Sequence, residues 1–218
     1  MGLLERRVIV FDFDGTIADT KASIISTATS VLVAWGLPAE ELPRMGEIIG
    51  PPFPQAFEQV FGLSHADAVE VTRRYRSIYH HLGLTAWPAF PGMVELLVEL
   101  RSAGRTLAVA SSKQASLVRR GLADNGILDL FATVRAKESD SEGTKTNAIM
   151  RALDDMGVGP GDAVMVGDRF HDVEAARACD LPCVGVLYGG TADRSELAEA
   201  GAAAIAESTG ELREILVP

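Results

Sequence analysis

The stretch Val8-Ile9-Val10-Phe11-Asp12-Phe13-Asp14-Gly15-Thr16 decides the expected fold. Its first four residues are apolar and mostly β-branched, which is typical of a buried strand in a parallel sheet. Two carboxylates follow where this strand should end, and side-chain alternation directs Asp12 and Asp14 to one side and Phe13 to the other. Ligands of open α/β sheets bind beyond the carboxyl ends of the strands. A strand end followed by a plain Asp-Gly turn is the alternative interpretation.

The neighbouring carboxylates of Asp12 and Asp14 need a cation or a proton beside them. Unit charges about 4 Å apart repel by about 1 kcal/mol in water and by about 4 kcal/mol at an effective dielectric of 20. The chain as a whole has a formal net charge of −10, which argues against nucleic acid or an anionic membrane as its main partner. An anionic substrate would therefore need local cations or a metal ion to hold it.

The composition is that of an ordinary globular protein, with 47% hydrophobic and 23% charged residues among 218. Cys179 and Cys183 are the only cysteines, and a single close pair favours reduced structural thiols over a disulfide framework or a zinc site. The first residues lack the apolar core of a signal peptide, and no apolar stretch approaches the length of a membrane span. We expect a cytoplasmic protein without a membrane partner.

The segment 17–87 predicts an all-helical insertion, because no convincing strand occurs in it. Helices are expected over 18–35, 55–61 and 66–81, and the proline-rich residues 87–91 are expected to form a stiff exit linker. The expected domains are therefore an α/β catalytic core formed by residues 1–16 and 88–218, and a helical cap formed by residues 17–87.

From Gly92 onward the sequence alternates between helical and strand patterns. Strands are expected over 106–110, 131–134, 163–166, 183–187 and 203–205. Helices are expected over 93–102, 117–125, 145–156, 172–178, 196–200 and in a last segment through Leu216. Strands separated by such helices make right-handed βαβ units. The expected fold class is α/β, a doubly wound, Rossmann-like parallel-sheet core with an inserted all-helical cap domain.

Further polar residues stand at other predicted strand and helix ends. Ser111, Ser112 and Lys113 follow one strand, and Lys145 begins a helix, where a cation gains nothing from the helix dipole. Asp168 and Asp172 follow another strand. Each has an ordinary alternative, as a helix cap, a solvated helix residue or an acidic first helical turn. If the strands are parallel, however, these groups share one edge of the sheet, which favours a joint site.

These motifs resemble those of the haloacid dehalogenase superfamily of phosphatases. The resemblance covers residues 8 to about 216 and rests on Asp12-Phe13-Asp14-Gly15-Thr16, the strand ending in Ser111, Lys145 and Gly167-Asp168-Arg169-Phe170-His171-Asp172. Within the superfamily the chain is similar to the phosphoglycolate phosphatase branch with a helical cap. Its 5′-nucleotidase-like members are favoured by Gly50-Pro51-Pro52, Ser112-Lys113, Gly167-Asp168-Arg169 with His171-Asp172, and Gly185-Val186-Leu187-Tyr188-Gly189.

The resemblance implies a catalytic role for four residues. Asp12 would be the nucleophile that forms an aspartyl phosphate, and Asp14 would be the general acid and then the general base. Ser111 and Lys145 would hold the phosphate oxygens, and Lys145 would also neutralise Asp12. The expected reaction is hydrolysis of a small phosphomonoester of the phosphoglycolate or nucleoside monophosphate type.

The resemblance also implies a Mg²⁺ cofactor. Its ligands would be Asp168, the Asp12 carboxylate and the Asp14 backbone carbonyl, an oxygen set that suits a hard cation, with Asp172 binding directly or through water. The metal would offset the clustered carboxylates and stabilise an anionic transition state.

The implied substrate contacts are Ser112 and Lys113 in the core and Gly50, Pro51 and Phe53 in the insertion. A plain helix connection is the alternative for the loop that contains Gly50, Pro51 and Phe53. Two other functions remain: a phosphosugar mutase similar to β-phosphoglucomutase, although the histidine typical of mutases is absent after the first motif, and a non-catalytic binding module. Whether the protein is a monomer or a homodimer stays open.

Overall fold

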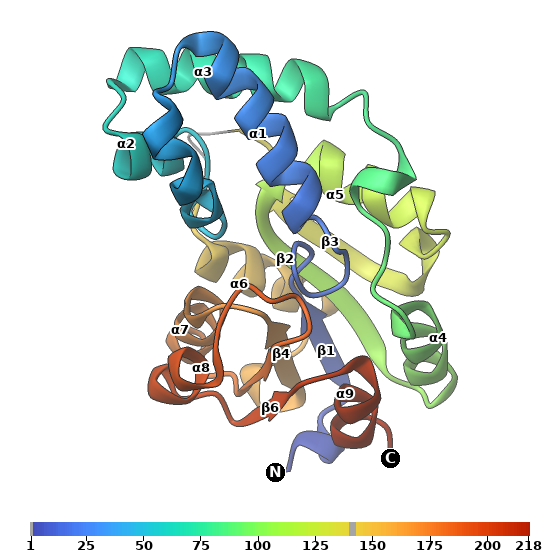
Figure 1. Ribbon diagram of the computed structural model, residues 1–218. Helices are drawn as coiled ribbons and strands as arrows, with labels where there is room; N and C mark the ends of the chain where they lie inside the picture. The colour runs from blue at the N-terminus through green and yellow to red at the C-terminus, as the bar shows by residue number, and fades with distance from the viewer. Residues whose placement is uncertain (1, 140–142) are drawn as a thin grey trace. The chain divides into compact units, whose positions relative to one another are not determined.

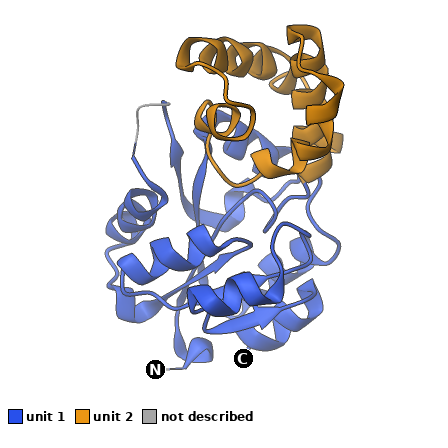
Figure 2. Cartoon of the chain, turned by 60° about the vertical axis from the view of Figure 1, so that its left-hand side comes forward, with its two compact units in different colours: residues 1–19, 88–218 blue, residues 20–87 orange. Residues whose placement is uncertain are grey.

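The computed structural model describes residues 2–139 and 143–218 (Figure 1). The chain divides into two compact units, one of residues 1–19 with 88–218 and the other of residues 20–87 (Figure 2). We call them the α/β unit and the helical unit.

The α/β unit is built on a six-stranded sheet in the order β3-β2-β1-β4-β5-β6, and each neighbouring pair is parallel. The strands are β1 (Val8–Phe11), β2 (Thr106–Gln114), β3 (Phe131–Lys137), β4 (Ala163–Gly167), β5 (Cys183–Val186) and β6 (Ala204–Ala206). The fully buried β1 lies between β2 and β4, where the chain direction across the sheet reverses. Such reversal points are where open α/β sheets bind ligands.

Helices cover both faces of this sheet. Val8 and Val10 pack in one apolar cluster with residues of α6 (Lys145–Met156), α7 (Phe170–Ala178) and α8 (Arg194–Ala200). The other face is covered by α4 (Met93–Ser102), α5 (Ala115–Asp124) and α9 (Thr209–Leu216) (Figure 1). Short 3₁₀ helices, η1 (Leu3–Glu5), η4 (Leu128–Leu130) and η5 (Pro160–Asp162), complete the unit. The predicted fold class, a doubly wound parallel sheet, is confirmed.

Two strands, β2 and β3, extend well beyond their predicted ends. The β2 strand continues past Ala110 to Gln114, because Gln114 still pairs with Lys137 of β3, which itself extends beyond the predicted end at Val134. The register shifts between Ala110 and Gln114, so this part of β2 is a bulge. The expectation that the strand ends before Ser111 was therefore wrong.

The helix that carries Asp172 also begins earlier than predicted. The α7 helix starts at Phe170, and the Asp172 carboxylate accepts a hydrogen bond of 3.1 Å from the backbone N–H of Arg169. Asp172 therefore lies in the first turn of α7, and its side chain caps the N-terminus of that helix. Smaller shifts of one or two residues occur where α5, α8 and β6 begin.

The helical unit contains α1 (Lys21–Trp35), η2 (Ala39–Ile48), α2 (Gln55–Phe61), α3 (His65–Tyr79) and η3 (Leu84–Ala86). Its interior holds a run of neighbouring aromatic rings. Tyr79 stacks on Tyr75 with centroids 5.0 Å apart and lies 5.6 Å from Trp87, while Tyr75 meets Phe53 edge-on at 4.9 Å. The unit contains no strand in residues 20–87, all of which the structure describes.

The chain leaves and re-enters the α/β unit at one paired point. Ala18 and Ala89 form an antiparallel bridge, in which Asp19 N–H donates to the Pro88 carbonyl at 2.8 Å and Phe90 N–H donates to the Ile17 carbonyl at 3.0 Å. The two ends of the segment 20–87 are therefore held side by side.

The two cysteines are free and buried, as the sequence predicts.

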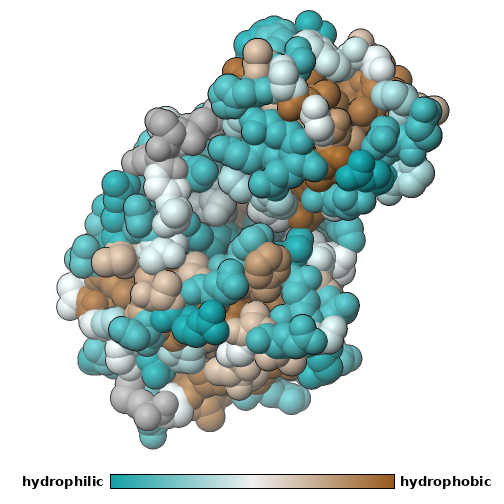
Figure 3. All heavy atoms as spheres, turned by 90° about the vertical axis from the view of Figure 1, so that its left-hand side faces the viewer, coloured by the Kyte–Doolittle hydropathy of each residue, from teal (hydrophilic) through white to brown (hydrophobic). Residues whose placement is uncertain are grey.

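One face of the protein shows mostly hydrophilic residues with apolar residues between them (Figure 3). Within the described residues, no helix combines the length and the apolar character that crossing a membrane requires.

Candidate active site

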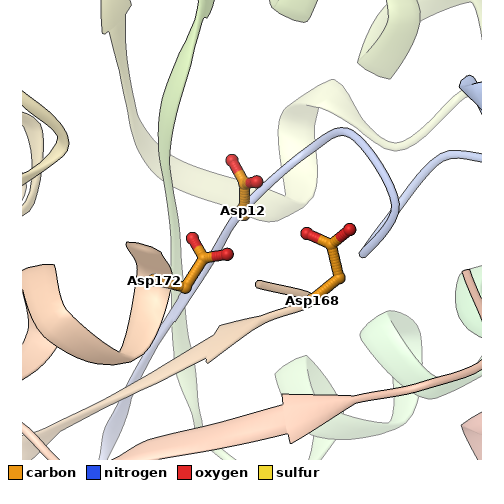
Figure 4. A group of neighbouring side chains, drawn as sticks. All are labelled: Asp12, Asp168 and Asp172. Carbon is orange, nitrogen blue, oxygen red and sulfur yellow. The ribbon is translucent and has the colours of Figure 1, made fainter. Parts of the chain in front are cut away.

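Three buried aspartates meet at the carboxyl ends of β1 and β4 (Figure 4). Asp12 follows β1, Asp168 follows β4 and Asp172 lies in the first turn of α7. Each offers a carboxylate oxygen, and these oxygens lie within 4.8 Å of one another. Because the strands are parallel, residues far apart in the sequence reach the same edge of the sheet.

Glycines allow the backbone to approach these carboxylates closely. Gly15 has a φ of +72°, and a Cβ atom there would lie 2.1 Å from Asp168 Oδ2. A Cβ atom at Gly167 would lie 2.3 Å from the Cβ of Asp172. Both distances are far below van der Waals contact, so a side chain at either position would displace an acid of the cluster.

Lys145 supplies a cation to this acidic cluster. It is the first residue of α6, and its Nζ lies 2.9 Å from Asp12 Oδ2 and also donates to Asp172 Oδ1. Burial alone would lower the pKa of Lys145, but the charges of Asp12 and Asp172 raise it above its ordinary value. The two carboxylates therefore favour the charged form of the lysine that lies between them.

The three carboxylates of the cluster carry more negative charge than the single ammonium of Lys145 can balance. Burial raises the pKa of Asp12 to about 6, with Lys145 opposing the rise and Asp172 adding to it. Burial, then Asp172 and Asp12, raise the pKa of Asp168 well above its ordinary value. The Asp12 Oδ1 atom is buried and has no hydrogen-bond partner among the described residues. An oxygen-only group with surplus negative charge fits a hard divalent cation.

Asp14 stands apart from the three clustered acids. Its carboxylate contacts Lys113 of β2, whose Nζ lies 2.9 Å from Oδ1 and 3.1 Å from Oδ2. The two acids of the opening motif therefore have separate lysine partners, Lys145 for Asp12 and Lys113 for Asp14. The sequence placed Lys113 among the substrate contacts and did not predict this pair.

Ser111 and Ser112 lie in the bulged end of β2, on the strand rather than after it. Ser111 is buried, and its Oγ accepts a hydrogen bond of 3.3 Å from the backbone N–H of Lys113. Ser112 is half-buried.

The loop after β5 contributes residues that sequence reasoning did not single out as site residues. The Thr191 hydroxyl donates to Asp168 Oδ2, and the Tyr188 hydroxyl donates to the Thr16 carbonyl at 2.9 Å. A Cβ atom at Gly189 would lie 2.5 Å from the Gly15 carbonyl oxygen. This loop therefore supports both the loop after β1 and the acid after β4. A lone threonine in a glycine-containing loop gives no local signal for such a role.

The predicted substrate contacts Gly50, Pro51 and Phe53 belong to the helical unit, between η2 and α2. Gly50 has a φ of 114°. The Phe53 ring packs on Phe57 with centroids 4.3 Å apart and meets Tyr75 edge-on. Phe53 is thus part of the aromatic packing of its own unit.

Comparison with known proteins shows the family to which the chain belongs. The family model for haloacid dehalogenase-like hydrolases matches residues 9–186. A 5′-nucleotidase of Pseudomonas aeruginosa is 35% identical over 183 residues, which cover 83% of this chain and 82% of the relative. The tyrosine-protein kinase PtkA of Mycobacterium tuberculosis is 35% identical over 212 residues, covering 96% of this chain and 72% of the relative.

Among solved structures, that of a predicted phosphatase from Clostridium acetobutylicum is similar to this chain with a TM-score of 0.88 and 28% identity. The match covers 96% of this chain and 97% of that protein. The matched segment 9–186 contains all three clustered acids. The chain therefore belongs to the haloacid dehalogenase-like hydrolase family and is a phosphatase of that family.

Proposed function

We propose that the chain hydrolyses a small phosphomonoester through an aspartyl-phosphate intermediate on Asp12, with Mg²⁺ as cofactor. The observation that carries the proposal is the unpartnered, buried Asp12 Oδ1 atom in a carboxylate cluster that also contains an ionised lysine. Burying a carboxylate oxygen without a hydrogen-bond partner costs free energy. The presence of such an atom in the folded protein therefore supports a ligand or a reaction at that oxygen.

In the first step a carboxylate oxygen of Asp12 attacks the phosphorus atom of the substrate. The bond between phosphorus and the ester oxygen breaks, and the leaving oxygen keeps the electron pair and takes a proton from Asp14. In the second step water attacks the same phosphorus atom and gives a proton to the Asp14 carboxylate. The bond between Asp12 and phosphorus then breaks, which releases inorganic phosphate and restores the Asp12 carboxylate.

The surrounding residues have distinct proposed roles. Lys145 and Ser111 hold the non-bridging phosphate oxygens, and Lys145 limits the repulsion between Asp12 and the anionic substrate. The Asp12 and Asp168 carboxylates and the Asp14 backbone carbonyl would hold Mg²⁺, with Asp172 binding it directly or through water, and the bound ion would offset the charge of the phosphate and the acids.

The proposed substrates are phosphoglycolate and nucleoside monophosphates. Similarity to a 5′-nucleotidase supports the second of these. We propose that the helical unit is a cap that selects the leaving group, through Gly50, Pro51 and Phe53, because the core motifs act only on the phosphate. A screen of phosphate release from phosphoglycolate, nucleotides and sugar phosphates, compared by kcat/KM, tests this choice.

The central experiment compares Asp12→Asn with the unmodified protein, using p-nitrophenyl phosphate with Mg²⁺ and with excess EDTA. Asp12→Asn should abolish phosphate release while the thermal melt stays cooperative. Asp129→Asn makes the same chemical change at an exposed residue and should keep full activity.

Undiminished activity in Asp12→Asn, or in EDTA, would overturn the proposed mechanism. Transfer of phosphate from ATP to a tyrosine-containing peptide, without release of phosphate from monoesters, would instead favour the activity for which PtkA is named.

A further inference from the structure

The two lysines at the sheet edge contact different acids, which indicates that they have different roles. Lys145 lies between Asp12 and Asp172, whereas Lys113 lies against Asp14. We propose that Lys113 is a positioning residue that holds Asp14 in the orientation required for proton transfer, rather than a contact for the substrate phosphate. The inference rests on the proposed role of Asp14 as general acid and base.

The geometry of the contact fixes the plane of the Asp14 carboxylate. The Lys113 Nζ atom is 2.9 Å from one carboxylate oxygen and 3.1 Å from the other, so both oxygens face the ammonium. The side chain of Lys113 is 8% exposed, whereas that of Asp14 is 30% exposed. The buried lysine therefore restrains a carboxylate that would otherwise rotate at the edge of the site.

The Lys113 side chain also contacts a buried aromatic ring. Its Nζ lies 6.0 Å from the centroid of the Phe13 ring, within the range of a cation–π contact. Phe13 is fully buried, and a Cβ atom at Gly121 of α5 would lie 2.4 Å from the Phe13 Cζ atom. The ring thus packs directly on the α5 backbone, and this packing supports the position of Lys113.

The bulge in β2 allows one strand to carry both Ser111 and Lys113, which have different proposed roles. The register shift between Ala110 and Gln114 places Ser111 and Lys113 in an irregular segment, where the Lys113 N–H donates to Ser111 Oγ. A bulge redirects side chains that regular alternation would fix. One irregular segment therefore carries the proposed phosphate contact Ser111 and the lysine that holds Asp14.

This arrangement predicts which reactions depend on Lys113. An alkoxide is a poor leaving group and needs the proton of Asp14 as the ester bond breaks, whereas a dinitrophenolate leaves without one. General acid catalysis contributes about 10²–10⁴-fold where protonation is needed. A misoriented Asp14 should therefore slow alkyl phosphates far more than activated aryl phosphates.

The experiment measures kcat/KM for 2,4-dinitrophenyl, p-nitrophenyl, phenyl and simple alkyl phosphates with the full chain and Mg²⁺. Lys113→Met keeps an unbranched, apolar side chain but removes the ammonium, and it should lower kcat/KM for alkyl phosphates at least about tenfold more than for 2,4-dinitrophenyl phosphate. Lys113→Arg, which keeps a cation, should recover part of this difference and serves if Lys113→Met does not fold. Lys137→Met, a matched change in β3, should keep the unmodified dependence on the leaving group.

A double-mutant cycle with Asp14→Asn gives a second readout. If Lys113 acts through Asp14, adding Lys113→Met to Asp14→Asn should cause little further loss of kcat/KM for alkyl phosphates. Additive losses, an equal loss across the whole substrate series, or a raised KM with unchanged kcat would each overturn the inference. Such results in an active phosphatase leave the proposed function standing, whereas an unmodified protein that releases no phosphate from any ester rejects the proposed function itself.

Discussion

The α/β unit and the helical unit bury polar groups of different kinds. The α/β unit buries the carboxylates of Asp12, Asp168 and Asp172 at one edge of its sheet. In residues 20–87, all of which the structure describes, the buried side chains that carry polar atoms are those of Thr20, Thr27 and Thr72 and of the aromatic Tyr75, Tyr79 and Trp87, and no charged side chain is buried. Charged residues of the helical unit form exposed pairs instead, such as Glu70 with Arg73 and Arg74.

The contrast is sharpest between one oxygen atom of each unit, Asp12 Oδ1 and Thr72 Oγ1, which are among the buried polar atoms without a hydrogen-bond partner in the described residues. The first belongs to a carboxylate beside two further acids and a lysine, where the proposed metal ion or reaction would offset the cost of burying it. The second is a hydroxyl in the packed interior of α3, where nothing charged is buried. An unpartnered polar atom therefore indicates a site only where neighbouring charges need the same missing partner.

Among the changes that test this comparison of the two units, removing Lys145 should have the largest effect on stability. Lys145→Met leaves the clustered carboxylates without their ammonium, so phosphate release should fall by about 10²–10³-fold in kcat. The free energy of unfolding of the metal-free protein should fall by about 3–5 kcal/mol, the usual cost of leaving a buried charge unpaired. Steady-state assays and urea melts measure the two effects. Equal stability of Lys145→Met and Lys137→Met would show that the acidic cluster does not need the lysine.

Adding Mg²⁺ should stabilise the protein through the same cluster. At 100 times the dissociation constant, binding to the folded state alone adds about 2.7 kcal/mol. A thermal melt with and without Mg²⁺ should therefore show a higher Tm, and Asp168→Asn should remove most of this shift. Asp155→Asn, at an exposed pair with Arg135, should retain it. A shift of equal size in Asp168→Asn would place the metal elsewhere.

The pH dependence of stability should differ in sign between the two units. Burial raises the pKa of Asp12 to about 6, so the folded metal-free protein binds this proton more tightly than the unfolded chain does. The contribution of Asp12 is therefore fully present below its ordinary pKa of 3.8 and is lost as the pH rises through about 6.

Glu70 titrates with the opposite sign. Hydrogen bonds from Arg73 and then Arg74 lower the pKa of Glu70 to about 2. Its contribution is present above its ordinary pKa of 4.5 and is lost as the pH falls through about 2, and solvent screening keeps it small. Chemical melts of the metal-free protein from pH 2.5 to 7 measure both contributions to the free energy of unfolding. The Asp12 contribution should be absent from Asp12→Asn, and the Glu70 contribution should be absent from Glu70→Gln. Identical profiles for Asp12→Asn and the unmodified protein would contradict the Asp12 prediction.

Replacing Thr72 should have the smallest effect and a favourable one. Thr72→Val keeps the shape of the side chain and removes the unpartnered hydroxyl, so the free energy of unfolding should rise by about 1 kcal/mol with no change in activity. Thr72→Ala, which leaves a cavity, should lower it instead. Destabilisation by both variants would show that the hydroxyl forms a hydrogen bond after all.

Local signals predicted much of this fold. The ends of α2, α4 and α6 coincide with those expected from apolar spacing and capping residues, and the strand Val8–Phe11 was predicted from its apolar, β-branched residues. The extension of β2 was not predictable in this way. Ser111 to Lys113 interrupt the apolar pattern, and only pairing with β3, a contact between distant parts of the sequence, continues the strand.

The same distinction applies to the site. Parallel strands share an edge, so the meeting of Asp12, Lys145 and Asp172 followed from the order of the motifs. The contact between Lys113 and Asp14 depends on the bulge in β2, and the bond from Thr191 to Asp168 depends on how the loop after β5 folds back. Neither leaves a pattern in the sequence near the residue concerned.

The antiparallel bridge between Ala18 and Ala89 has a consequence for how such a chain can change over time. Asp19 and Pro88 are joined by a main-chain hydrogen bond of 2.8 Å, so a short linker could replace everything between them without altering the strand order of the sheet. An insertion whose two ends are paired in this manner can be exchanged for another segment while the sheet keeps its pairing. If the helical unit selects the substrate and the aspartates carry out the chemistry, as we propose, these two properties can evolve separately.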